Sequence, residues 1–301
     1  MKKSIFKASF EESLNLLDDG SLQFAKKDYY EHLGKGLKNG RPSIGFKIKS
    51  VIFTILFVFG GNFLLALFAF SLNDEDPKDL TLPVYKPLLL TPELFLICCF
   101  IWLSLVLVGK MFRKPFIRPY RYRFHIVTYL IWFCIEFNLL GITVALPTLK
   151  PLGIYFIYFL LLIIGLLFIR SEKRSLTNRF FGENSGETIL DRVARNIALY
   201  GSGLLGIAVI IKVVLSHSGI AISQNLTLLG LLLTWIVLDI GFLAMIVFME
   251  FPFFLEGYYK IKYPEEYRDW EDKSVEEWYG KKYLKKHKEL LKANNEKEIN
   301  F

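Results

Sequence analysis

The chain has 301 residues, of which 53% are hydrophobic and 22% are charged, and its formal net charge is +8. A mean hydropathy of +0.36 is too high for a soluble domain, because the surface of such a domain has to be solvated. The charged residues must therefore be segregated from long apolar runs. This composition predicts an all-α, polytopic integral membrane protein.

Residues 1–49 are predicted to form a short amphipathic helical segment on the cytoplasmic side of the membrane. Ser9 and Glu12 have the spacing of a helix-capping box, and the apolar residues around them recur at helical intervals. The lysines at the N-terminus are not followed by an apolar run of the signal-peptide type. We therefore expect this segment to precede the first transmembrane helix and to stay on the cytoplasmic side.

Residues 50–255 are predicted to form a bundle of six transmembrane helices, because six apolar runs approach the length needed to cross ~30 Å of hydrocarbon. The six runs are 50–72, 88–108, 124–146, 152–169, 197–215 and 226–249. Residues 256–301 are predicted to form a charged, helical cytoplasmic tail, in which Ser274 and Glu277 have the spacing of a second capping box.

The orientation of the bundle is predicted from the distribution of Lys and Arg, which accumulate in cytoplasmic segments next to the spans. The segment before span one, the loops after spans two and four, and the tail hold 10, 6, 6 and 11 of the 37 basic residues. Only Lys78, Lys86 and Lys150 lie in the other loops. Both termini are therefore predicted to be cytoplasmic, in a multi-pass protein of the cell membrane.

The loop after span two interleaves basic and aromatic residues directly at a helix end, which suits the headgroup layer of a bilayer. We expect this loop to contact anionic lipid headgroups and find no reason to predict nucleic-acid binding. The candidate headgroup contacts are Lys110, Arg113, Lys114, Arg118, Arg121 and Arg123.

Two carboxylates, Glu136 and Asp239, fall near the middle of spans three and six, where an ionised group costs on the order of 3 kcal/mol. Each follows a tryptophan by four residues, at Trp132 and Trp235, which places acid and indole on one helical face. Spans three and six are equivalent in a three-plus-three inverted repeat, an architecture that places ion or substrate sites near the midplane. The candidate polar cluster comprises Glu136, Asp239, Asn62, Asn138 and Thr234.

Two interpretations of this cluster remain open. Glu136 and Asp239 either form a proton- or cation-binding pair, or they are protonated or hydrogen-bonded groups that fix helix packing. The sequence contains no HExxH, GxxxxGK[ST] or GxSxG motif, and its three cysteines lie within apolar runs without metal-ligand spacing. No catalytic residue, cofactor or metal is therefore predicted.

Three classes of function remain. The first is a non-enzymatic protein that acts by contact with another membrane component, in an accessory, assembly or immunity role, with a membrane-protein partner or a second copy of the chain. The second is a proton- or cation-linked transporter or channel that uses Glu136 and Asp239. The third is an enzyme of lipid-linked substrates that uses the basic loops.

Overall fold

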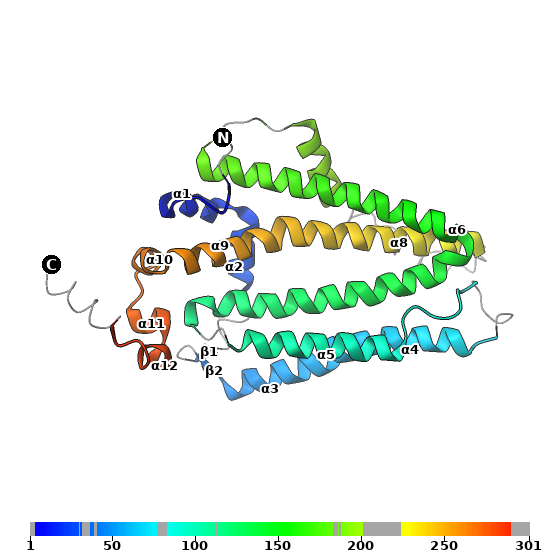
Figure 1. The fold of residues 1–301 in the computed structure, drawn as a ribbon, viewed down its shortest axis with the longest axis horizontal. Coiled ribbons are helices and arrows are strands. Elements are labelled where there is room, and N and C mark those ends of the chain that lie inside the picture. Colours follow the sequence, from blue (N-terminus) through cyan, green and yellow to red (C-terminus); the bar gives the residue numbers. More distant parts are fainter. Residues whose placement is uncertain are drawn as a thin grey trace.

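The computed structural model describes residues 4–29, 31, 37–38, 41–76, 83–111, 114–182, 186, 188–200 and 224–289. These residues are almost entirely helical, as predicted, and the long helices run side by side (Figure 1). One short antiparallel pair of strands, β1 (Leu37–Lys38) and β2 (Arg41–Pro42), interrupts them. Within this described part of the chain, four helical stretches are long and apolar enough to cross a membrane, and they are Ile44–Asp74, Pro92–Gly109, Pro115–Phe181 and Leu226–Lys262.

The first of these stretches joins α3 (Ile44–Phe53), the π-helical η4 (Thr54–Phe59) and α4 (Gly60–Asp74). It begins six residues before the predicted span because the hydroxyl of Ser43 accepts a hydrogen bond from the Phe46 amide and caps the helix. The basic residues of α3 therefore belong to the same continuous helix as the apolar span.

The second stretch, α5 (Pro92–Gly109), begins four residues later than the predicted span 88–108. The local cause is Thr91, whose Oγ1 accepts a hydrogen bond from the Leu94 amide at 3.3 Å, followed by a proline in the first helical position. The cap and the proline together define where the helix starts.

The third stretch contains two predicted spans in one bent element, α6 (Arg118–Phe181), which follows the short 3-10 helix η5 (Pro115–Ile117). Lys150 lies at the bend with φ 56° and ψ 171°, between Pro147 and Pro151. Residues 118–149 form the first arm and residues 151–181 the second arm. The predicted spans 124–146 and 152–169 fall on these two arms, which run in opposite directions (Figure 1).

The last stretch joins α8 (Gln224–Ala244), the π-helical η6 (Met245–Glu250) and α9 (Phe251–Lys262). It runs alongside the second arm of α6 in the same direction, because residues later in this stretch contact residues later in the second arm. The successive contacts are Trp235 with Ile157 in one buried cluster, Phe248 with Phe168 at 5.2 Å between ring centroids, and Tyr259 with Phe180 at 5.5 Å.

The predicted fifth span, 197–215, lies mostly outside the described residues. Residues 189–200 are helical, and the side chain of Ala194 is buried in a cluster with Phe168 and Ala244. This segment therefore packs beside the second arm of α6 and the end of α8.

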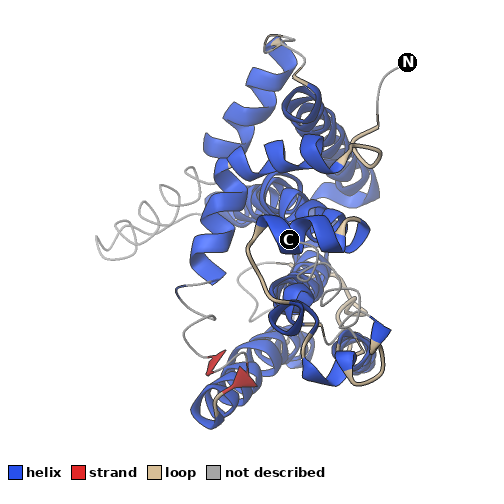
Figure 2. Cartoon of the chain, turned by 90° about the vertical axis from the view of Figure 1, so that its left-hand side faces the viewer, coloured by secondary structure: helices blue, strands red, loops and turns tan. Residues whose placement is uncertain are grey.

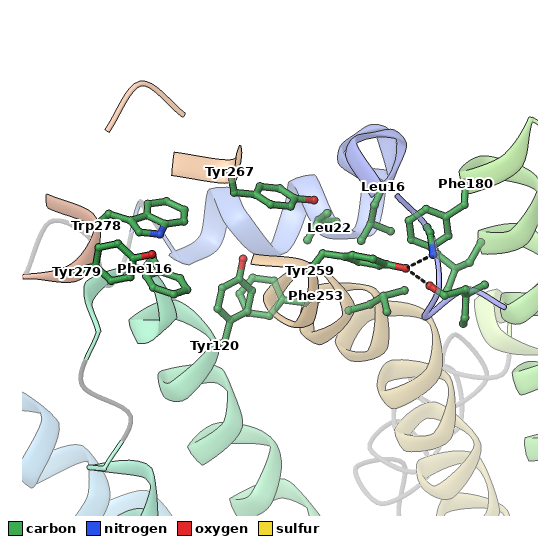
Figure 3. Close-up of a cluster of buried hydrophobic side chains, with 14 of the residues drawn as sticks. Leu16, Leu22, Phe116, Tyr120, Phe180, Phe253, Tyr259, Tyr267, Trp278 and Tyr279 are labelled. Carbon is green, nitrogen blue, oxygen red and sulfur yellow. Dashed lines mark hydrogen bonds between the residues drawn. The ribbon is translucent and has the colours of Figure 1, made fainter. Parts of the chain in front are cut away.

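The largest buried core lies at the end of the bundle where α6 terminates, outside the apolar parts of the spans. This end faces the viewer in Figure 2, and Figure 3 shows the buried side chains. We call it the terminal module and define it as residues 4–28, 114–121, 172–181 and 250–287. Its further elements are α1 (Phe10–Leu14), η1 (Asn15–Asp18), α2 (Gly20–Asp28), α10 (Pro264–Trp270), α11 (Val275–Tyr279) and α12 (Lys281–Leu284). The capping boxes predicted at Ser9 and Ser274 are both present at the starts of α1 and α11.

The terminal module joins the two chain ends, which the sequence treats as separate segments. Tyr259 in α9 accepts a hydrogen bond from the Ala8 amide at 3.2 Å and donates one to the Ile5 carbonyl (Figure 3). Tyr263 donates to the Ala8 carbonyl at 2.9 Å, and Tyr267 lies 2.9 Å from the hydroxyl of Ser13. A row of tyrosines on the C-terminal helices therefore holds the N-terminal segment in place.

Candidate functional site

Glu136 lies on the first arm of α6 and its side chain is fully buried. Its Oε1 accepts a hydrogen bond of 2.6 Å from the indole nitrogen of Trp132, the residue one helical turn earlier. Its Oε2 has no hydrogen-bond partner among the described residues. Trp132 packs with Val58 of η4 and Trp102 of α5, so this carboxylate belongs to the side of α6 that faces η4 and α5.

Asp239 lies on α8 and is held by Asn138 of the first arm of α6. The Asn138 amide nitrogen donates to Asp239 Oδ1 at 2.7 Å. The Asn138 carbonyl oxygen accepts from the Trp235 indole at 2.9 Å and from the Tyr158 hydroxyl at 2.8 Å. Asn138 therefore connects both arms of α6 with α8, and Asp239 Oδ2 is left without a partner among the described residues.

The two carboxylates belong to different clusters. Glu136 and Asn138 are two residues apart, which separates their side chains by about 200° around an α-helix. Their hydrogen-bond partners accordingly lie on different neighbouring helices. The two Trp-acid motifs also differ, because Trp132 donates to its own acid and Trp235 donates to Asn138. The structure thus brings Asp239 and Asn138 together and places Glu136 elsewhere.

The remaining predicted members of the cluster have separate positions. Asn62 on α4 is fully buried and donates to the Val58 carbonyl of its own helix at 2.6 Å, beside the Trp132 cluster. Thr234 donates to the Gly230 carbonyl of its own helix at 2.8 Å and does not join the Asn138 network. Tyr158 is a member that the sequence did not reveal, since it reaches Asn138 only because α6 bends at Lys150.

The predicted headgroup contacts also divide between different environments. Arg123 faces inward, where its guanidinium grips both carboxylate oxygens of the buried Glu250 at 2.6–2.9 Å. This ion pair gives Arg123 a partner within the bundle, and its predicted lipid contact stays a prediction. Arg121 lies over the Tyr122 ring, and the Lys114 ammonium lies 4.5 Å from the centre of the Tyr283 ring.

The other candidates lie near the helix ends. Lys110 is exposed at the C-terminal cap of α5, and Arg118 at the start of α6 lines a surface groove together with Lys114. Arg113 lies outside the described residues.

Buried ion pairs cross-link the terminal module. Glu256 on α9 is fully buried and contacts Lys26 of α2 at 2.6 Å and Lys260 at 3.3 Å. Lys260 also contacts Glu271 at 2.5 Å, and Arg179 at the end of α6 pairs with Asp19. Burial raises the pKa of the Tyr267 hydroxyl to about 12 in the same region. These pairs join segments from both chain ends and from α6, so the module is fixed by polar as well as apolar contacts.

Within the described part of the chain, no group of three His, Cys, Asp or Glu side chains is placed to hold a metal ion. The chain has no significant match among protein-family models, curated proteins or solved structures.

Proposed function

We propose that this chain is a six-span protein of the cell membrane, with both termini cytoplasmic, that acts without catalysis by contacting another membrane component. The role would be an accessory, assembly or immunity function. The observation that carries the proposal is the terminal module, in which both chain ends fold together into one packed body on a single end of the bundle.

The directions of the described helices support six crossings. The second arm of α6 ends in the terminal module, whereas α8 starts at the opposite end of the bundle and runs back toward the module (Figure 1). The chain between Phe181 and Gln224 therefore has to return past the second arm, which is about 45 Å long at 1.5 Å per residue. The predicted span 197–215 falls within this return.

The charge distribution supports the orientation. The terminal module, the starts of α3 and α6 and the end of α6 lie at one end of the bundle, and these regions carry most of the 37 basic residues. Because basic residues next to spans are retained on the cytoplasmic side, this end is proposed to be cytoplasmic.

The surface of the terminal module offers aromatic groups to a partner. Phe24 on α2 is 62% exposed and Trp270 on α10 is 51% exposed, although most other aromatic rings of the module are buried or partly buried. Exposed aromatic side chains are enriched in the contact sites of protein interfaces. A role in partner contact would account for the packing of both chain ends into one module, which has no catalytic motif.

The proposal can be tested by placing a photo-crosslinking amino acid at position 24 or 270 in the native membrane. We expect a discrete protein adduct from at least one of these positions. Phe100 on α5, which is 73% exposed on a candidate span, is the matched control and should give lipid adducts only. Protein adducts at position 100 alone, or no protein adduct at position 24 or 270, would contradict the proposal.

A proton- or cation-linked transporter is the second candidate. The observation in its favour is that Glu136 and Asp239 are buried, each with one oxygen that has no partner in the described part of the chain. Their placement in different clusters favours two packing sites over a paired site. In proteoliposomes, a transporter would lose ion flux in both Glu136→Gln and Asp239→Asn. Unchanged flux in both variants, with additive changes in the free energy of unfolding, is what separate packing sites predict.

A further inference from the structure

A groove of about 1260 Å³ lies between the start of α6 and the C-terminal helices α11 and α12. Its walls come from chain segments far apart in the sequence, so neither segment reveals it alone. The rings of Phe116 and Trp278 stack at 4.6 Å, with an interplanar angle of 7°, and hold the two walls together. Gly280, with φ 81°, packs so close to Pro115 that an added Cβ would lie 3.1 Å from the proline ring. The groove is therefore a built feature of the fold.

The lining of this groove is predominantly basic. The cations are Lys114, Arg118, Lys273, Lys281, Lys282 and Lys286, and the acids are Glu276 and Glu277. Both acids already have partners, since Glu276 pairs with Lys281 at 2.9 Å and Glu277 completes the capping box with Ser274. Among the described residues, neither Lys282 nor Lys286 forms an ion pair, and both are exposed. The groove thus carries an excess of positive charge that is available to an anion.

Apolar side chains also line the groove. Met111, just after the end of α5, is 77% exposed, and Ile261 near the end of α9 is 56% exposed. Met111 follows directly after a helix that is apolar enough to span a membrane. The groove therefore presents both cations and apolar surface at the end of the bundle, and its volume exceeds the roughly 300–1,000 Å³ that is typical of small-molecule pockets.

We propose that this groove binds the headgroup of an anionic phospholipid, with the phosphate between Lys114, Lys282 and Lys286 and the acyl chains leaving past Met111 and Ile261. A free inorganic anion would use only the cations, whereas a lipid uses both kinds of lining. Basic pockets at helix ends recognise lipid headgroups by this combination of charge and location. This site is independent of the partner contact proposed above, and it includes C-terminal lysines that were not among the predicted headgroup contacts.

The test uses the purified full chain in neutral detergent and titrates it with dioctanoyl phosphatidic acid, dioctanoyl phosphatidylcholine and inorganic phosphate. We expect saturable binding of phosphatidic acid and at least about tenfold weaker binding of the other two. In the variant Lys114→Gln/Lys282→Gln/Lys286→Gln, the affinity for phosphatidic acid should fall at least about tenfold.

The matched control is Lys47→Gln/Lys49→Gln/Lys173→Gln, which removes the same charge from exposed lysines outside the groove. Its affinity should stay within about twofold of the parent chain, since its effect is limited to long-range electrostatics. The variant Lys282→Arg/Lys286→Arg should retain binding, which separates loss of charge from loss of fold. Equal weakening in groove and control variants, equally tight binding of inorganic phosphate, or no saturable binding of phosphatidic acid would overturn the proposal.

Discussion

At the residue scale, the chemistry of the buried polar groups was predictable and their partners were not. The sequence identifies Glu136, Asp239 and Asn138 as unusual because an apolar span surrounds each of them. It also places Trp132 one turn before Glu136, and the structure shows the corresponding hydrogen bond. The bond from Trp235 to Asn138 depends on which helix lies opposite, and no local pattern encodes that choice.

Asn138 is expected to contribute more to stability than any single hydrogen bond would suggest. The variant Asn138→Ala removes one hydrogen bond each from Asp239, Trp235 and Tyr158. We expect the free energy of unfolding to fall by about 1–2 kcal/mol, because each interhelical bond contributes on average about 0.6 kcal/mol. Unfolding in mixed detergent micelles, followed by tryptophan fluorescence, measures this loss.

Thr234→Ala is the control for that measurement. Among the described residues, Thr234 bonds to its own helix alone, so its loss should cost less than about 0.5 kcal/mol. Losses of equal size in the two variants would show that Asn138 does not connect the helices.

Tyr267 is expected to make the terminal module sensitive to high pH. Burial raises its pKa to about 12, above the ordinary value of 10, so the folded state retains the phenolic proton more strongly than the unfolded state. Its contribution is complete below pH 10 and is lost as the pH rises toward 12, by up to about 2–3 kcal/mol. The free energy of unfolding of the parent chain should therefore decrease more steeply over this interval than that of Tyr267→Phe. Parallel pH profiles would contradict this assignment.

At the scale of the elements, local sequence signals account for several helix starts. They do not account for the extension of α6 beyond its predicted span. Ser9 and Ser274 start α1 and α11 through the capping boxes that the sequence predicts, whereas Thr91 and Pro92 start α5 four residues after the predicted start of that span. The second arm of α6 continues well beyond the predicted end at residue 169. Its extra turns bury Leu176 and Phe180 in the terminal module, which a hydropathy pattern for a membrane span does not include.

Gly257 is expected to be required where α9 crosses the start of α6. A Cβ at this position would lie 2.8 Å from two ring carbons of Tyr120, which is itself buried against Phe253. We expect Gly257→Ala to lower the free energy of unfolding by about 1–3 kcal/mol through overpacking. The measurement is detergent unfolding followed by far-ultraviolet circular dichroism.

Gly241→Ala serves as the matched control, because a Cβ there meets no atom of the described residues within 4 Å and alanine favours a helix. This variant should be as stable as the parent chain or more stable by up to about 1 kcal/mol. If both glycine variants behaved alike, the close approach of α9 to Tyr120 would be refuted.

At the scale of the whole molecule, the two chain ends form one body, and the bundle has an end that carries the module and an opposite end that does not (Figures 1 and 2). The sequence predicts this polarity from its basic residues, since both terminal segments are assigned to one side. It does not predict that the segments bind each other, because a tyrosine-rich segment next to a span is also typical of the aromatic belt at a membrane interface.

The proposed six-span topology predicts that Gly186 and Gln224 lie on opposite sides of the membrane. In a background where Cys98, Cys99 and Cys134 are replaced by alanine, Gln224→Cys should react with a membrane-impermeant maleimide in intact cells. Gly186→Cys should react only after permeabilisation, because one crossing is proposed to separate the two positions. Labelling of both positions from the same side would contradict the fifth crossing.

The sequence by itself determined the all-helical class, the apolar stretches, several helix ends and the unusual polar residues. Each of these depends on residues within a few turns of one another, where hydrophobic periodicity and capping act directly. Only the tertiary structure decided that Glu136 and Asp239 occupy different clusters, that Arg123 pairs with Glu250, and that the two chain ends share one core. The bonds from Asn138 to Asp239 and from Arg123 to Glu250, and the contacts between the two chain ends, join residues about one hundred or more positions apart. They depend on how helices pack, which local periodicity does not specify.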